Sequence, residues 1–389
     1  MSVLLPTVST GLVRMLQLVV LLILANVASA ASAHVLVAGF GLIGAFAMMS
    51  DSGAVNFVLS RPPADLDRRV FDRAVGFHLA LAVAGAVGAL ILTALTTGTG
   101  VVGEVALVLF ALAATQAFDS AGRVTRAPAL VRHDDARYAA PDFVLFAAKV
   151  PILLAAVVTA SPLPLLALPV PSLAVLAWTY LANRDALGPA SVDSVPRLYR
   201  QILEFGFTGF LSAGFSQVPL VVAALALPVA DVAALSVIYR VVQSLDLVPA
   251  TLSLQLMPRV RDRPAGPWRY WALFAAGGAI VAAAIVAFAP VLQLLFGRIE
   301  LPWGAIVFIA AAFAPKAGNF ALVAYLMGVG RIRTRLAITA IAFAVAVPLA
   351  LAMAATGSVT GLAFGTLLIE LLFALIAVIV LRRDRATVA

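Results

Sequence analysis

The chain has 389 residues, of which 63% are hydrophobic and only 11% are charged, and its net charge is +8. A soluble globular protein carries about a quarter charged residues, so this composition excludes an ordinary soluble enzyme and is typical of a membrane protein. The basic residues fall in short clusters between apolar runs, which excludes a nucleic-acid-binding protein and agrees with the positive-inside rule.

Apolar runs along the chain are long enough to cross a membrane as helices. About 20 apolar residues are needed to span about 30 Å of hydrocarbon. Runs of this kind cover residues 12–32, 35–59, 74–96, 103–122, 142–161, 163–182, 202–227, 231–257, 270–296, 304–328, 336–355 and 359–381. The sequence therefore predicts an all-α polytopic membrane protein with about twelve transmembrane helices.

The charges between the runs test this number and give the orientation. The connections after every second run are rich in arginine, whereas the opposite connections hold one cation, Arg298. The arginines in the first class are Arg61, Arg68, Arg69, Arg73, Arg123, Arg126, Arg132, Arg137, Arg184, Arg197, Arg200, Arg259, Arg261, Arg263, Arg269, Arg331, Arg333 and Arg335. Arg14 opens the first run, and residues 382–385 add three more arginines after the last. The asymmetry predicts that both termini are cytoplasmic in a bacterial inner membrane.

The first run has a second interpretation. Arg14, the apolar residues 16–24 and the small residues 28–33 are also typical of a signal peptide with an A-x-A cleavage site. Cleavage would leave eleven spans and reverse the orientation of every other helix. We expect the segment to be retained as a helix.

The longest connection near the middle of the chain divides the runs into two sets of six. It covers residues 183–200 and contains Pro189 and Pro196. We therefore expect an N-terminal six-helix lobe over residues 1–190 and a C-terminal six-helix lobe over residues 191–389. Because each set starts in the cytoplasm, any repeat is parallel, and the ends of runs 2 and 8, with Asp51 and Asp246, resemble each other faintly.

Several short stretches resemble the polysaccharide flippases of the multidrug/oligosaccharidyl-lipid/polysaccharide (MOP) superfamily. The stretches are MSDSGAVNFVLSR at 49–61, FGF at 205–207, YRVVQ at 239–243, LMPR at 256–259, FG at 296–297 and GSVTGLA at 357–363. The order and spacing match over essentially the whole chain, although the chain is short for this family and lacks the Ala-Arg-x-Leu-Gly stretch that commonly follows the first helix.

The resemblance implies a fold like that of the MATE transporters, with two six-helix lobes around a central cavity. Helices 1, 2, 7 and 8 would line this cavity, which would open alternately to each side of the membrane. The implied substrate is a polyprenyl-pyrophosphate-linked sugar or oligosaccharide, moved from the inner to the outer leaflet for cell-surface polysaccharide synthesis.

Ionisable residues inside the spans are the candidates for a site, because each costs about 2.5–3.5 kcal/mol at the centre of a membrane helix. Arginine suits a pyrophosphate because its planar fork can bind two oxygens at once. The predicted substrate-binding residues are Arg240, Gln243, Arg14, Asp51, Lys316 and Lys149, with Arg240 and Gln243 one helical turn apart. The predicted ion-coupling carboxylates are Asp51, Asp246 and Glu370.

Structural roles are open for the same residues. Asp246 or Glu370 would neutralise Arg240, and Lys316 would pair with Glu370 between spans 10 and 12. Lys149 would extend its ammonium group to the cytoplasmic face. Interpretations as packing, topology or membrane-interface residues apply to Asp51, Arg14, His78, Asp119, Asp142 and Glu204.

The sequence predicts no metal site, no cofactor and no enzyme activity. It has no cysteine, and His34, His78 and His133 are far apart. The expected partners are a lipid-linked sugar, membrane lipid and polysaccharide-assembly proteins. The alternatives are a cation-coupled multidrug exporter of the same superfamily, a membrane-embedded glycosyltransferase or polymerase, and a non-transporting scaffold in polysaccharide assembly.

Overall fold

The computed structural model describes residues 4–50, 53–59, 66–97, 103–132, 134–188, 195–262 and 266–386. Within these ranges the chain is almost entirely helical and forms no β-strand, which confirms the all-α prediction. Twelve helical segments are long and apolar enough to cross a membrane, as predicted. The first runs from Val8 to Val27, a few residues earlier than expected. The candidate residue Asp51 lies outside the described residues.

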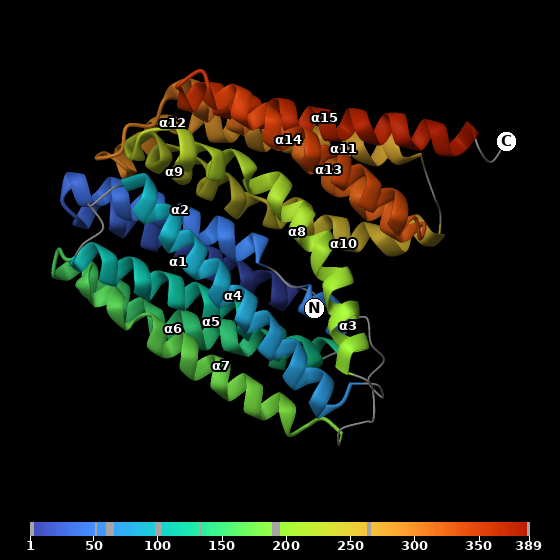
Figure 1. Cartoon of the computed structure of the whole chain (residues 1–389), viewed down its shortest axis with the longest axis horizontal. Helices are drawn as coiled ribbons and strands as arrows, with labels where there is room; N and C mark the ends of the chain where they lie inside the picture. The colour runs from blue at the N-terminus through green and yellow to red at the C-terminus, as the bar shows by residue number, and fades with distance from the viewer. Residues whose placement is uncertain are drawn as a thin grey trace. The chain divides into compact units, whose positions relative to one another are not determined.

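The chain divides into two compact units, Met1–Gly214 and Phe215–Ala389 (Figure 1). The first contains α1 (Leu4–Val27), α2 (Ala30–Met49), α3 (Ala54–Leu59), α4 (Arg68–Thr97), α5 (Glu104–Val131), α6 (Asp135–Val158), the 3₁₀ helix η3 (Leu163–Ala167) and α7 (Pro169–Arg184). The second contains α9 (Val229–Leu245), α10 (Leu247–Asp262), α11 (Pro267–Ala287), α12 (Ala289–Leu295), α13 (Trp303–Gly328), α14 (Ile332–Ala354) and α15 (Val359–Ala386). The division falls within α8 (Val195–Ala226), and the predicted lobe boundary at residue 190 stays a prediction.

Four of the predicted apolar runs are built from two helical elements, and the run at 163–182 contains η3 and α7. The run at 35–59 contains α2 and α3, and Gly53 before α3 has a φ of +68°, which glycine adopts readily. The run at 231–257 contains α9 and α10, with Asp246 at the junction as the C-cap of α9. The run at 270–296 contains α11 and α12, and Pro290 lies in the first turn of α12, where its missing N–H costs little.

One helix lies at the centre of each unit. In the first unit α5 packs against α2, α4, α6 and α7, and in the second α13 packs against α9, α10, α11, α14 and α15. Both are the fourth long helix of their set. Corresponding pairs also pack in both units, α4 with α5 and α11 with α13, then α5 with α7 and α13 with α15. This correspondence supports the expected parallel repeat.

Glycines allow close approach to the central helices. Gly39 of α2 faces the Leu109 side chain of α5, and Gly278 of α11 faces the backbone of α13. Membrane helices rely on small residues at such contacts, because lipid supplies no hydrophobic force to drive the helices together. A glycine therefore lets a neighbouring helix approach the central helix closely in each unit, against a leucine side chain of α5 and against the backbone of α13.

Large apolar side chains cover much of the outside of each unit. Val158 is 84% exposed, Leu294 is 81% exposed, and Leu95 and Ile280 are each 74% exposed. A soluble monomer rarely displays apolar surface on this scale. Lipid contact accounts for it, because the helices satisfy their own backbone hydrogen bonds and need only apolar side chains on the outside.

The adjacent glycines of α11 provide a matched test of this packing. A methyl group added at Gly278 would lie 2.9 Å from Ala314 Cα and 3.0 Å from the Phe313 carbonyl oxygen. We expect Gly278→Ala to lower the free energy of unfolding in detergent by about 1–3 kcal/mol, because the backbone of α13 must shift. Gly277 faces open space, so Gly277→Ala should leave the stability unchanged or slightly raised. Equal effects of the two variants would contradict the packing described.

Candidate functional site

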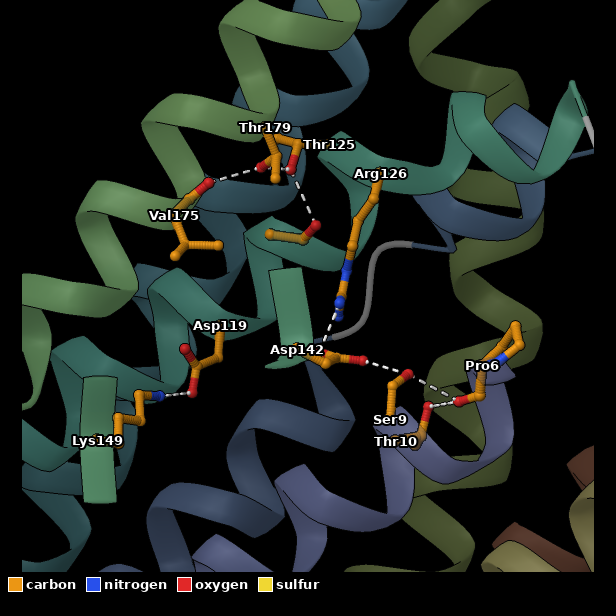
Figure 2. A network of polar contacts seen from close by, with 11 residues as sticks. Pro6, Ser9, Thr10, Asp119, Thr125, Arg126, Asp142, Lys149, Val175 and Thr179 are labelled. Carbon is orange, nitrogen blue, oxygen red and sulfur yellow. Dashed lines mark hydrogen bonds and ion pairs between the residues drawn. The ribbon is translucent and has the colours of Figure 1, made fainter. Parts of the chain in front are cut away.

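A buried ion pair joins α5 and α6 in the first unit. Lys149 Nζ lies 2.6 Å from Asp119 Oδ2 (Figure 2), and the lysine side chain is only 8% exposed. The expectation that Lys149 extends to the cytoplasmic face is therefore wrong. The pair borders a cavity of about 40 Å³, also lined by Gln17, Thr115 and Gln116, which is large enough for water. The other carboxylate oxygen of Asp119 is buried and has no hydrogen-bond partner in the described part of the chain.

A second buried pair in this unit ties α1, α5 and α6 together. Arg126 donates a hydrogen bond from Nη1 to Asp142 Oδ1, and the Ser9 hydroxyl lies 2.8 Å from Asp142 Oδ2 (Figure 2). The same hydroxyl lies 3.0 Å from the Pro6 carbonyl oxygen. The Arg126 guanidinium also stacks over the Tyr138 ring, 5.2 Å from its centroid. Arg126 and Ser9 thus bind the buried Asp142 carboxylate, and the Tyr138 ring packs against the Arg126 guanidinium.

These contacts correct the interpretation of several residues as membrane-interface groups. Asp142 is 2% exposed, and His78 is 1% exposed with its Nε2 2.9 Å from the Ser120 hydroxyl. Asp119 is the partner of Lys149. The interface interpretation is wrong for these three residues because each has a polar partner inside the unit, on α5 for His78 and Asp142 and on α6 for Asp119. Glu204 is exposed as expected.

The second unit contains a comparable pair between the junction of α9 and α10 and the central helix α13. Lys316 Nζ lies 2.7 Å from Asp246 Oδ2. Lys316 therefore forms its ion pair with Asp246 and not with Glu370, and the neutralisation of Arg240 by Asp246 or Glu370 stays a prediction. The second oxygen of Asp246 is buried and without a hydrogen-bond partner among the described residues, as in Asp119.

Glu370 of α15 is bound by an amide. Asn319 Nδ2 lies 2.9 Å from Glu370 Oε2 and 3.0 Å from the Glu370 carbonyl oxygen. The Asn319 Oδ1 accepts a hydrogen bond from Trp271 Nε1 of α11 at 3.2 Å. Asn319 follows Lys316 by one turn, so α13 presents donors to two carboxylates from one face. Asn319 and Trp271 were not among the predicted site residues. The three-residue spacing between Lys316 and Asn319 was a signal by which the asparagine could have been found.

The remaining candidates are half-buried residues on two other helices. Arg240 lies at the middle of the span Val229–Ala250, and Gln243 follows it by one turn, so the two share a face as expected. Arg14 lies inside the span Val8–Val27 and precedes Gln17 by one turn. Gln17 Nε2 lies 3.4 Å from Gln116 Oε1 of α5. Arg14 and Arg240 each have a contact partner of their own.

The Lys149–Asp119 pair can be tested by removing one or both charges. Lys149→Met leaves a buried carboxylate without its cation, and we expect it to lower the free energy of unfolding by about 3–5 kcal/mol. The double variant Lys149→Met/Asp119→Leu should lose less, because no uncompensated charge remains. Thermal unfolding of the purified protein in detergent would measure both.

The exposed pair between Arg200 and Glu204 supplies the control. Its side chains are 83% and 66% exposed, so Arg200→Met should cost no more than about 1 kcal/mol. A double variant as unstable as Lys149→Met alone would show that the pair does not act as a charge-compensated unit.

Solved structures of transporters share this fold. The lipid II flippase MurJ in an inward-closed conformation is 11% identical, matched over 97% of this chain and 87% of that chain, with a TM-score of 0.69. An inward-facing multidrug resistance MATE transporter of the MOP superfamily is 14% identical, matched over 96% and 95%, with a TM-score of 0.68. A MOP superfamily transporter from Pyrococcus furiosus, described as having a binding pocket of reversed polarity, is 15% identical over 99% and 96%, with a TM-score of 0.59.

No protein-family model and no curated protein sequence matches the chain. At identities of 11–15% the likeness to solved structures establishes the arrangement of helices and leaves the substrate open. The MATE-like fold that the sequence resemblance implied is confirmed: the chain has the fold of MOP-superfamily transporters.

Proposed function

We propose that this protein is a multi-pass flippase of the bacterial inner membrane, with both termini in the cytoplasm. It moves a polyprenyl-pyrophosphate-linked sugar or oligosaccharide from the inner to the outer leaflet by alternating access, for cell-surface polysaccharide synthesis. It is a transporter and catalyses no covalent chemistry. The fold shared with a lipid II flippase supports this proposal, as does the resemblance of residues 239–243 and 357–363 to the polysaccharide flippases.

The choice between an anionic and a cationic substrate rests on whether the carboxylates inside the spans are already bound by donors. Asp119, Asp142, Asp246 and Glu370 are each bound by a donor from their own unit. A carboxylate engaged in this way offers little to an organic cation. The guanidinium of Arg240 lies at the middle of its span, and a cation at this depth favours an anionic substrate.

A pyrophosphate needs such a cation in order to cross. Moving one ion of this size into hydrocarbon costs on the order of 20 kcal/mol in the Born limit. A guanidinium offsets this cost by bonding two phosphate oxygens through its fork. We assign that role to Arg240 and Arg14, with Gln243 bonding a sugar hydroxyl and the isoprenoid tail remaining in lipid. Lys149 and Lys316 would reach the substrate only after releasing their aspartates, and the role of Asp51 stays a prediction.

The multidrug exporter is the second candidate function. A MATE transporter matches the fold with a TM-score of 0.68, close to the 0.69 of the flippase, so the helix arrangement does not separate the two. The charge of the substrate does, because an exporter of organic cations needs an accessible carboxylate. A non-transporting scaffold would move neither substrate, and a transport assay separates it from both.

The central experiment follows the leaflet distribution of lipid-linked sugar in a deletion strain complemented with wild-type or variant protein. We expect wild type to relieve inner-leaflet accumulation. Arg240→Ala should slow translocation by roughly 10- to 100-fold, the loss expected for charge-assisted hydrogen bonds worth about 1.5–3 kcal/mol. Arg240→Lys should recover only part of the rate, because lysine keeps the charge and loses the fork.

Arg269 provides the control, since it is an exposed arginine in the first turn of α11. Arg269→Ala should translocate like wild type. If deletion leaves the leaflet distribution of lipid-linked sugar unchanged, the flippase proposal is wrong and the exporter or the scaffold is favoured. Full activity of Arg240→Ala would remove Arg240 from the route.

The proposal includes coupling to a cation gradient through Asp246 and Glu370. Asp246 has one oxygen bound to Lys316 and one buried oxygen without a hydrogen-bond partner among the described residues. A proton or cation arriving at this second oxygen would weaken the hold of Asp246 on Lys316. Because Lys316 and Asn319 lie on one face of α13, the change would reach Glu370 through the same helix.

Transport by protein in proteoliposomes would test this coupling. We expect an ionophore that collapses the gradient to slow wild-type translocation, and Asp246→Asn to make the remaining rate insensitive to the gradient. Asp231→Asn changes a carboxylate in the first turn of the same helix and should retain the gradient response. A wild-type rate that is the same with and without the gradient would rule coupling out.

A further inference from the structure

A large basic cavity is lined by residues from the start of α4, the end of α7 and the start of α8 in the first unit. Its volume is about 710 Å³, within the range of about 300–1,000 Å³ that is typical of small-molecule sites. Of the described residues, four arginines and one aspartate line it, and their charges sum to four minus one, or +3. The proposed transport route uses none of these residues.

Two of the arginines build the wall of the cavity. Arg184 Nε lies 3.0 Å from Asp72 Oδ1 and 3.2 Å from Asp72 Oδ2, which joins the end of α7 to the start of α4. Arg68 Nε donates to the Arg184 carbonyl oxygen at 3.3 Å. Tyr180 donates a further hydrogen bond to Asp72 at 2.7 Å. Asp72, the one carboxylate among the described lining residues, is thus already bound by two donors.

The other two arginines are available to a ligand. Arg73 donates from Nη1 to the Tyr199 hydroxyl at 3.1 Å, which orients the guanidinium and leaves four of its five N–H groups. Arg69 is exposed and makes no hydrogen bond or ion pair with another described residue. Gly76, on the same side of α4, leaves open space where a side chain would stand. Two guanidinium forks beside an open floor suit a group with several anionic oxygens, such as a phosphate.

The surroundings favour a phosphate carried by a lipid. A helix of 30 residues, such as α4, is about 45 Å long and exceeds the roughly 30 Å of hydrocarbon, so its first turns reach the headgroup level. On α8, Leu203 and Phe207 follow Tyr199 at four-residue spacing and are 51% and 55% exposed. On α4, Val83 continues the face of Gly76 by two turns and is 45% exposed. An apolar surface suited to acyl chains therefore continues from the basic cavity.

We propose that this cavity is a binding site for the phosphate headgroup of an anionic glycerophospholipid, with Arg69 and Arg73 as its ligands. The bound lipid would link the start of α4 to the end of α7 and the start of α8. Basic recesses between membrane helices on the cytoplasmic side bind anionic headgroups in this manner. The site lies outside the proposed flipping route and does not depend on what the protein transports.

The test titrates purified full-length protein in detergent with phosphatidylglycerol and with phosphatidylcholine, and counts bound lipid by native mass spectrometry. We expect wild type to prefer phosphatidylglycerol. Each arginine near an anionic lipid contributes about fivefold in affinity, so Arg69→Gln/Arg73→Gln should bind it about 25-fold more weakly. Gly76→Glu places a carboxylate in the open space and should also weaken binding, whereas Gly76→Ala should not.

Arg269→Gln, which removes an exposed arginine at the start of α11, should bind phosphatidylglycerol like wild type. Inorganic phosphate, added as a competitor, should displace little of the lipid. The proposal is overturned if the double arginine variant binds phosphatidylglycerol as tightly as wild type, or if wild type does not distinguish it from phosphatidylcholine. Complete displacement by inorganic phosphate would instead assign the cavity to a soluble anion.

Discussion

The structure depends on how charged side chains are stabilised inside the hydrocarbon of a membrane, which does not solvate them. Each unit places a lysine against an aspartate, Lys149 against Asp119 and Lys316 against Asp246, and in each pair one partner belongs to the central helix. An isolated ion at this depth would cost several kcal/mol. Pairing therefore decides which side chains α5 and α13 turn toward their neighbours, and it adds polar contacts to the packing that glycines provide.

The two lysine–aspartate pairs share a feature that is relevant to conformational change during transport. Only two of the 26 lysines and arginines are lysines, and both lie in these pairs. In each pair the ammonium binds one carboxylate oxygen, and the other oxygen is buried without a hydrogen-bond partner among the described residues. A lysine is a compact point charge with three rotatable donors, and it lacks the rigid fork by which arginine binds both oxygens of a carboxylate. Such a contact can be exchanged for a proton or a cation more easily than a bidentate arginine contact.

The sequence predicted the spans well because the thickness of the bilayer fixes both their length and their composition. It predicted Arg240 and Gln243 on one face for the same kind of reason, since helical spacing is local. Partner choice could not be predicted in this way. Whether Lys316 meets Glu370 or Asp246 depends on the rotation of α13 and on the break between α9 and α10, and both are set by packing between distant segments. The Arg126–Asp142 pair was missed because Arg126 had been counted among the connection charges.

The different positions of the lysines and the arginines support our proposal of an anionic substrate more strongly than the fold does. Fold alone fits MurJ and MATE transporters almost equally. Both lysines are bound to aspartates, which balances their charge within each unit. Arg14 and Arg240 place two further cations inside the spans. Arg69 and Arg73 repeat the arrangement at the headgroup level. A protein that handled organic cations would need the opposite bias, with carboxylates left accessible and cations balanced. Our proposal of a phosphate-bearing substrate rests on this difference.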